Sequence, residues 1–525
     1  MRSVTFLVFT GGLLALTGCA RLHFFQRDAL VPAPVSSRPN TADSVWATSG
    51  RQYNQHGAIH HLLVGRHHRA VWAAPVRVPV FQLSSASATA GALTPTKLGG
   101  GFQSTSLSLQ GADGKPYVIR SLDKDPARIL PRFWQRTFIS SALRDATSAG
   151  MGYGALVVPP LSQALGVPHT HPSIYYVPLD EKQLGTDEAN QRLRGTLVLL
   201  EEKYNGKKVS TSLLPQARDF VSDEDMRKLL YADPHYRPDQ PALLQARLLD
   251  ILIGDWDRHA GQWQWAVLPD PAAPATRRLF APVPKDRDQV FFRLSDGVVP
   301  WILTRKFAVR HLVTFHRHYR DLKALTDQGR YVDQRGLNEL TRKDYQAAAA
   351  RSQARLPDSL LARAVRRLPP AVYALEGPRL LADLQARRDA LPAAAEQFYL
   401  LKTLRPVVAG TDQPDHFVVA RTPDSTTVRV YSRTLGADSL YYQRTFYTKE
   451  TKRLTLEGLQ ARDLFEVTGP TGLQLVIHAG AGADVLRAAS RRRLRYEEEA
   501  NGRLNRPEPK NKHEQFHPYD RLEDE

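Results

Sequence analysis

The fold is decided by two short acidic stretches that flank a predicted β-hairpin. The first reads Asp257-Arg258-His259-Ala260-Gly261-Gln262, and the second reads Asp286-Arg287-Asp288. Between them, residues 262–268 and 277–283 have the alternation of two strands, joined by a Pro-rich turn. Hard divalent cations prefer carboxylate and amide oxygens, and a positioned Asp can serve as a general base. The pattern therefore predicts that the two acidic loops converge at one cation-dependent site.

An apolar helix is predicted immediately before the first acidic loop. Pro241 suits a first helical position, and apolar residues recur on one face from Leu244 to Ile251. Gly254 suits the left-handed conformation that ends many helices, so Asp257 would lie in an exposed loop. The alternative is that the acids and arginines of this region form an internal ion-pair network that only holds the loops in place.

A glycine-rich turn lies upstream between predicted strands. It reads Gly99-Gly100-Gly101-Phe102-Gln103, and the hairpin-turn sequence Asp113-Gly114 precedes a further strand at residues 117–120. Glycine lets backbone N–H groups approach phosphate oxygens because no Cβ blocks them. Such a turn is by itself a common loop, but its position ahead of the acidic loops favours a role in covering phosphates.

These motifs resemble those of the atypical protein-kinase-like superfamily, which includes HipA-like, secretory-pathway and spore-coat (CotH-like) kinases. Asp257-Arg258-His259, with Gln262 five positions after the Asp, is similar to their catalytic loop, in which that last position is Asn or Glu. Asp286-Arg287-Asp288-Gln289-Val290-Phe291 is similar to the Asp-x-Asp-x-x-Phe metal loop of spore-coat kinases. Residues 249–259 also resemble uncharacterised exported proteins of Bacteroidetes-type bacteria, some of which carry an outer-membrane surface-antigen barrel.

The resemblance implies a role for each matched residue. Asp257 would be the catalytic acid that orients or deprotonates the attacking hydroxyl, and Gln262, Asp286 and Asp288 would hold Mg²⁺ or Mn²⁺. Arg120 would take the catalytic place of the phosphate-pairing Lys of kinases, with the same charge but a different shape and hydration. The residues that would bind ATP or another nucleotide are Gly99, Gly100, Gly101, Gln103, Arg120 and Lys124.

Composition and pattern divide the chain into six segments. They are a lipoprotein signal peptide (1–18), a tether and N-terminal segment (19–85), a kinase-like small lobe (86–205), a kinase-like helical lobe with the catalytic and metal loops (206–400), a β-rich domain (401–490) and a charged tail (491–525). The predicted fold class is α+β, a two-lobed kinase-like core followed by a small antiparallel β domain.

One motif near the end of the β domain has two interpretations. Residues 480–486 read Gly-Ala-Gly-Ala-Asp-Val-Leu and resemble one repeat of a calcium-binding β-roll. Repeats of that kind need stacked neighbours to complete a calcium site, and the sequence shows only one good copy. A plain glycine turn is therefore favoured.

The first residues are typical of an export signal. Arg2 precedes a short apolar run, and Leu16-Thr17-Gly18-Cys19 resembles the bacterial lipobox, in which the cysteine is lipidated. Cys19 is the only cysteine of the chain, so no intramolecular disulfide can form. We expect a cell-envelope protein anchored by lipid on Cys19, at the outer membrane and facing the periplasm, with an outer-membrane barrel as a candidate partner.

The net charge and the histidine content restrict which functions and partners are expected. The formal net charge of +18 suits anionic surfaces or phosphate-bearing ligands, but no nucleic-acid recognition motif accompanies it, so nucleic acid is not expected as a partner. A cluster of histidines lacks a Cys or carboxylate pattern for a metal, so surface or packing roles are favoured. Its members are His56, His60, His61, His67 and His68. Two function classes remain: a metal- and nucleotide-dependent phosphotransferase, and an inactive kinase-like scaffold or binding lipoprotein.

Overall fold

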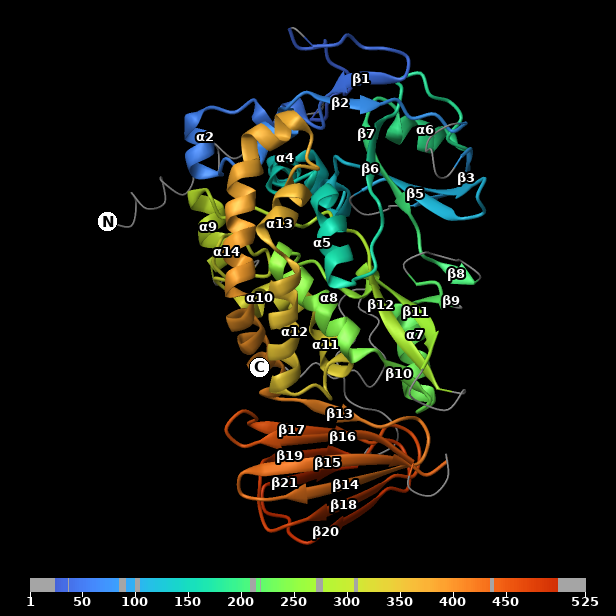
Figure 1. The fold of residues 1–525 in the computed structure, drawn as a ribbon, viewed down its shortest axis with the longest axis vertical. Coiled ribbons are helices and arrows are strands. Elements are labelled where there is room, and N and C mark those ends of the chain that lie inside the picture. Colours follow the sequence, from blue (N-terminus) through green and yellow to red (C-terminus); the bar gives the residue numbers. More distant parts are fainter. Residues whose placement is uncertain are drawn as a thin grey trace, which may run out of the picture.

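The chain folds into a two-lobed core and a separate β-rich domain (Figure 1). The structure, a computed structural model, describes residues 24–35, 37–84, 91–99, 104–207, 214–217, 219–270, 277–305, 310–434 and 439–498. The predicted signal peptide with Cys19, the loop residues Gly100, Gly101 and Gln103, and the tail beyond 498 lie outside the described residues. No helix in the described ranges combines the length and the apolar character that crossing a bilayer requires. The α+β class and the separate β-rich domain are confirmed.

The small lobe is a five-stranded antiparallel sheet with the strand order β3-β4-β5-β7-β6. Its strands are β3 (Leu93–Gly99), β4 (Ser106–Gly111), β5 (Pro116–Ser121), β6 (Ser173–Tyr176) and β7 (Leu197–Glu202). Between β5 and β6 lie the helices α4 (Phe138–Asp145) and α5 (Val158–Leu165). Side chains alternate across the strands. Leu107, Ile119 and Val198 pack into a core with α6 (Asp187–Leu193), and Arg120 and Glu201 line a cavity next to the second lobe.

The helical lobe surrounds one buried helix, α8 (Gln240–Ile253). The other helices of this lobe are α7 (Asp223–Ala232), α9 (Val298–Arg305), α10 (Leu322–Thr326), α11 (Arg330–Gly336), α12 (Arg342–Arg355), α13 (Asp358–Val365) and α14 (Pro370–Thr403). A second sheet has the order β10-β12-β11-β9-β8. Its strands are β8 (Gly206–Lys207), β9 (Asp219–Ser222), β10 (Tyr236–Pro238), β11 (Trp263–Pro269) and β12 (Arg278–Pro284). The predicted hairpin between the acidic loops is thus confirmed as β11–β12.

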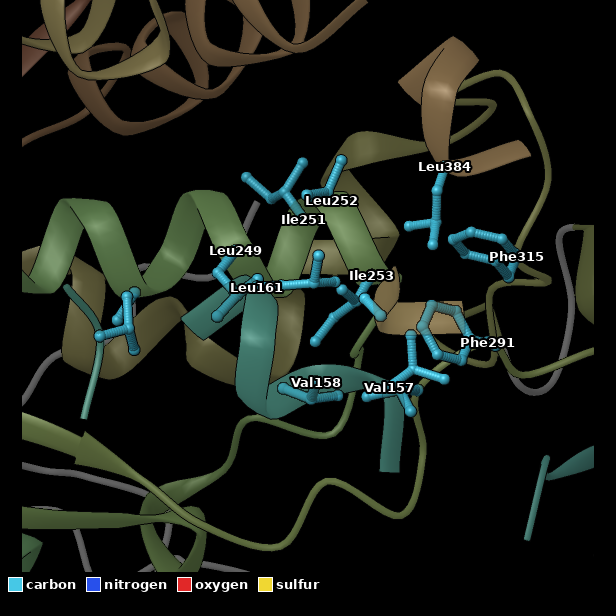
Figure 2. Close-up of a cluster of buried hydrophobic side chains, with 14 of the residues drawn as sticks. Val157, Val158, Leu161, Leu249, Ile251, Leu252, Ile253, Phe291, Phe315 and Leu384 are labelled. Atoms are coloured by element: carbon cyan, nitrogen blue, oxygen red, sulfur yellow. The ribbon is translucent and has the colours of Figure 1, made fainter. Parts of the chain in front are cut away.

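The end of α8 is fixed by its packing. Figure 2 shows Ile251 and Ile253 of α8 in the apolar cluster that also holds Phe291 and Phe315. Gly254 ends the helix in the left-handed conformation with φ 70°, as predicted, and Phe315 packs directly against it. The chain therefore leaves α8 in one direction, and this places the first acidic loop.

The N-terminal segment packs against both lobes. It contains β1 (Ser44–Ala47), α2 (Ala58–Leu63), α3 (Arg69–Ala73) and β2 (Val76–Pro79), and β1 and β2 pair antiparallel. The segment then joins the small lobe, where the Phe81 N–H donates to the Tyr176 carbonyl at 2.7 Å.

The C-terminal domain is built mostly from parallel strands. One sheet, β13-β17-β19-β21, is parallel throughout, and in the other, β16-β15-β14-β18-β20, the pairs β14–β18 and β18–β20 are parallel. The bounds are β13 (Val407–Ala409), β14 (Asp415–Arg421), β15 (Ser425–Ser432), β16 (Ser439–Tyr447), β17 (Arg453–Glu457), β18 (Leu464–Thr468), β19 (Gln474–His478), β20 (Val485–Ala488) and β21 (Leu494–Glu497).

Antiparallel pairing, predicted for this whole domain, is therefore wrong outside the β14–β15–β16 meander. From β17 onward each successive strand enters the opposite sheet, and from β19 onward each strand pairs with the strand two positions earlier, as in a solenoid. Alternation of side chains along a strand is the same for both directions of pairing, so it could not have revealed this arrangement.

The turn at residues 480–484 belongs to a stack and is not isolated. The Ala481 N–H donates to the Leu459 carbonyl at 2.7 Å, in the turn one rung away. The Asp415 N–H donates to Asp463 Oδ1 at 2.8 Å, and the Asp463 N–H donates to Asp484 Oδ1 at 2.8 Å. We call Asp415, Asp463 and Asp484 the aspartate ladder. The turn that the sequence predicts is therefore present, and its stacked neighbours have different sequences.

Candidate functional site

A cavity of about 210 Å³ lies between the small lobe and the two acidic loops. Its polar wall contains Arg120 of β5 and the acids of the second loop, and its apolar wall contains Leu143 of α4 and Trp256. The Trp256 indole N–H is buried and has no hydrogen-bond partner among the described residues. The cavity thus combines a charged end with an apolar end, as many small-molecule sites do.

Arg120 links the small-lobe sheet to the second acidic loop. Its Nη1 lies 2.5 Å from Asp286 Oδ2, and its Nε lies 3.3 Å from Glu201 Oε1 on β7. Burial alone would raise the pKa of Asp286, but the charges of Arg120 and Lys124 outweigh burial, and the pKa is lowered. Asp286 is therefore an ionised carboxylate at neutral pH.

Lys124 contacts Asp288, the other acid of this loop. Burial and the nearby charge of Asp286 raise the pKa of Asp288 to about 7, although Lys124 opposes them. The charge of Asp257 also raises the pKa values of Lys124 and Asp288, which places this acid close to the pair. The side chain of Asp257 is 22% exposed, so it is open to a ligand.

The N-terminal segment fixes the position of Lys124. The Tyr53 hydroxyl donates to Asp123 Oδ1 at 2.5 Å, and Gln52 Nε2 donates to Asp123 Oδ2 at 2.9 Å. The Lys124 N–H donates to the same carboxylate at 2.8 Å. Residues far upstream thus hold the backbone that carries this cation.

Arg258 ties the two acidic loops together. Its guanidinium donates to the Gln262 carbonyl at 2.9 Å and to the Lys285 carbonyl at 3.0 Å, and its side chain is fully buried. The Lys285 N–H in turn donates to the Gln262 carbonyl at 3.1 Å. The predicted convergence of the loops is therefore present in the backbone.

The internal ion-pair network weighed as an alternative is also present, beneath the cavity. Asp250 and Asp255 are buried against Arg258 and Arg287; Arg287 Nη1 lies 2.7 Å from Asp255 Oδ2. This network uses Arg258 and Arg287 but leaves Asp257, Asp286 and Asp288 outside it. The structure thus separates the acids of this region into an internal group and a cavity group.

Gln262 offers an oxygen that the protein does not use. The residue is buried, and Oε1 has no hydrogen-bond partner among the described residues. An orphaned amide oxygen costs free energy unless a ligand supplies its partner. Amide and carboxylate oxygens are the donors that Mg²⁺ and Mn²⁺ accept, so Gln262, Asp286 and Asp288 fit such an ion chemically.

The second acidic loop contains two residues in the left-handed backbone region, Asp286 with φ 59° and Phe291 with φ 58°. Asp tolerates this conformation, but a bulky Phe adopts it rarely, and such strain is concentrated at functional sites. Phe291 is buried, and its N–H donates to the Ile253 carbonyl at 3.1 Å. The end of α8 therefore holds the strained loop in place.

Of the residues predicted from the sequence, the structure brings Arg120, Lys124, Asp286 and Asp288 together around the cavity, with Asp257 close by. Gln262 meets the same loop through its backbone. Gly99 ends β3 and does not line the cavity, and the rest of its glycine-rich turn lies outside the described residues.

Two half-buried lysines near Arg120 were missed. Lys203 Nζ donates to Ser108 Oγ at 3.0 Å, and neither Lys203 nor Lys285 pairs with a carboxylate in the described chain. Burial and the charge of Arg120 lower the pKa of both, and that of Lys285 falls to about 8. Lys285 immediately precedes Asp286, and this adjacency could have identified it from the sequence as a candidate site residue.

Comparisons with known proteins add one finding. No protein-family model matches the chain, and a search of curated proteins finds no match. Among solved structures, the chain is similar to the crystal structure of CtkA, a Helicobacter pylori proinflammatory kinase, with a TM-score of 0.30 and 13% sequence identity. That similarity covers 57% of this chain and 95% of CtkA. The TM-score is too low to support an argument about fold or function.

Proposed function

We propose that this chain is a metal- and nucleotide-dependent phosphotransferase with a kinase-like core. The observation that carries the proposal is the meeting of Arg120 with Asp286 and of Lys124 with Asp288 at one cavity. Gln262, whose backbone contacts the same loop, adds a buried Oε1 that has no hydrogen-bond partner among the described residues. Phosphoryl transfer needs fixed cations for the phosphate oxygens and an acid that positions the hydroxyl. The cleft supplies both.

The residues divide this work as follows. Gln262, Asp286 and Asp288 would hold Mg²⁺ or Mn²⁺, which when bound neutralises charge on the phosphate oxygens. Asp257 orients the acceptor hydroxyl and takes its proton, because it lies next to the paired acids and its ion-pair partner is His259, at 3.8 Å, rather than Arg120 or Lys124. Arg120 binds phosphate oxygens while remaining next to Asp286, and Lys203 and Lys285 are further cations without a carboxylate partner in the described chain.

The supporting experiment is a phosphate-transfer assay on the full-length chain in mild detergent, with nucleotide and Mn²⁺ or Mg²⁺. We expect Asp257→Ala and Asp286→Ala each to lower the rate by about 10²-fold or more, because each removes an interaction made with the reacting groups. The matched control is Asp358→Ala, which removes an exposed carboxylate of α13. Circular dichroism checks that the variants fold, and wild-type turnover in both site variants would refute the assignment.

A second candidate is a catalytically inactive scaffold or binding lipoprotein for outer-membrane assembly or a barrel partner. The internal pairing of Asp286 with Arg120 and of Asp288 with Lys124 favours it, since any metal must compete with these cations. Thermal unfolding distinguishes the two. A rise in Tm that needs metal and nucleotide together supports the enzyme, and no rise with any combination supports the scaffold.

We also propose that the protein is an envelope lipoprotein, anchored through Cys19 at the outer membrane and facing the periplasm. The support is the sequence of the first residues, with the apolar run that ends at Leu16-Thr17-Gly18-Cys19. A phosphotransferase in that compartment acts where ATP is scarce, so its phosphate donor is an open part of the proposal.

A further inference from the structure

A second cluster of metal-ligating side chains lies at the junction of the N-terminal segment and α4. His56 Nε2 lies 3.1 Å from Asp145 Oδ1, and His60 Nε2 lies 3.6 Å from Asp145 Oδ2. The three ligand atoms all lie within 4.8 Å of one another. The sequence analysis found no carboxylate near these histidines, because Asp145 comes from the end of a distant helix.

The spacing suits one ion with nitrogen and oxygen ligands. Ligands of tetrahedral Zn²⁺ lie about 2.0–2.2 Å from the metal, so neighbouring ligand atoms are roughly 3.4 Å apart. The rings of His56 and His60 are stacked, with centroids 3.8 Å apart and planes 9° from parallel, and both Nε2 atoms face Asp145. An imidazole lone pair lies in its ring plane, so the two rings must turn toward each other when both bind one ion. Two imidazoles and one carboxylate leave a fourth position for water.

Other histidines nearby do not belong to the cluster. His67 Nδ1 lies 2.9 Å from Ser148 Oγ, and His68 Nε2 lies 2.9 Å from the Phe291 carbonyl. Both are buried, so their expected packing role is consistent with their contacts. His56 and His60 differ because both meet the same carboxylate and their side chains are 14% and 29% exposed, which leaves a path for an ion.

Asp145 already has one cationic partner. Arg69 Nη1 and Nη2 donate to its two oxygens at 2.6 Å each, and the Arg69 side chain is buried. An ion at this site would share the carboxylate with Arg69 and would depend on its two imidazole bonds. The site therefore favours a nitrogen-preferring ion over Mg²⁺ or Mn²⁺, which the oxygen donors of the cavity would take.

We propose that His56, His60 and Asp145 form a site for Zn²⁺ or a similar borderline divalent cation, which fastens the N-terminal segment to α4. An ion at this position would affect the walls of the cavity. Asp145 ends α4, and Leu143 of the same helix lines the cavity. The N-terminal segment also holds Asp123 beside Lys124. Ion binding would therefore rigidify two walls of the cavity without touching it.

The test measures metal binding directly and does not depend on any activity. The full-length chain in detergent is stripped with chelator and dialysed against Zn²⁺ in the presence of excess Mg²⁺, and bound zinc is counted by mass spectrometry. We expect one tightly bound equivalent, which raises Tm. His56→Ala and His60→Ala should each weaken its binding at least tenfold. The matched control, His61→Ala, changes the histidine next to His60 that is not part of the cluster and should bind as the wild type does.

Co²⁺ provides a second readout for the wild-type protein, since tetrahedral coordination gives strong visible absorption that the two histidine variants should lose. If the wild type binds no zinc, or if both histidine variants keep its stoichiometry and affinity, the site does not exist. Either result leaves the phosphotransferase proposal untouched, because that proposal rests on other residues.

Discussion

The pKa values of two groups of carboxylates in this chain are shifted in opposite directions. Near the cavity, Asp250 lies among three arginines and Asp286 lies beside Arg120 and Lys124, and these cations lower the pKa values of both acids although burial acts to raise them. In the β domain, the aspartate ladder has no Arg, Lys or His nitrogen within 4 Å in the described chain. Burial raises the pKa of Asp463 to about 9 and that of Asp415 to about 6.

The difference shows what each group of acids can do. A buried carboxylate stays ionised where nearby cations compensate for its lost hydration, and burial raises its pKa where such cations are absent. Asp250 and Asp286 are therefore charged, and Asp286, at the cavity, is suited to ligands that carry cations. Asp463 and Asp484 each accept the backbone N–H of the preceding ladder residue, and Asp463, with a proton bound at neutral pH, does so as a neutral group.

The largest expected effect on stability comes from removing one charge of the cleft network. Asp250 Oδ2 lies 2.9 Å from Arg247 Nη1 and 3.3 Å from Arg258 Nε, and Asp250 also contacts Arg287. Asp250→Asn removes one buried negative charge that three guanidinium groups share, so we expect a loss of about 3–5 kcal/mol in the free energy of unfolding. Urea unfolding measures it.

The control for that variant is Asp358→Asn, which breaks an ion pair on the surface. The side chain of Asp358 is 65% exposed and contacts Arg388. Solvent screens such pairs, so the unfolding midpoint should stay within experimental error of the wild type. Equal losses in the two variants would mean that the network beneath the cavity does not stabilise the fold.

A smaller effect is expected at the turn that places the first acidic loop. Gly254 and Gly166 both end helices in the left-handed conformation, each with φ 70°. A Cβ at Gly254 would lie 2.8 Å from Phe315 Cδ2, whereas a Cβ at Gly166 would meet nothing within 4 Å. We expect Gly254→Ala to cost about 2–3 kcal/mol and Gly166→Ala about 1 kcal/mol. Thermal unfolding compares them, and equal costs would show that Phe315 moves aside freely.

The elements that the sequence predicted correctly are set by local rules. Pro at the start of α8, Gly254 at its end and the alternation of β11 and β12 each act over a few residues. The resemblance of the two loops to kinase motifs added the expectation that they converge, and Arg258 joins them. Short-range patterns and a family motif together were therefore enough for the core of the candidate site.

What the sequence did not predict depends on contacts between distant segments. Asp145 meets His56 across 89 positions, and Tyr53 meets Asp123 across 70. The parallel pairing of the solenoid depends on which strand lies beside which, and side-chain alternation does not encode that choice. The aspartate ladder could not be predicted from the sequence for the same reason. Of its three members, only Asp484 lies in a recognisable glycine motif.

The last prediction concerns the protonation of the ladder. Between pH 4 and pH 9 the folded chain keeps a proton on Asp463 that the unfolded chain has lost, since an unperturbed Asp titrates near pH 4 and the pKa of Asp463 is about 9. The unfolded state then binds fewer protons, so the free energy of unfolding falls as pH rises through this window. Asp463→Asn stays neutral, and its side-chain carbonyl can still accept the Asp415 N–H, so its stability should fall less steeply. Urea midpoints at pH 5, 7 and 9 measure the slope, with Asp424→Asn as an exposed control in the same domain. Identical slopes for wild type and Asp463→Asn would mean that the ladder is ionised like the acids of the cleft, and the contrast between the two regions would disappear.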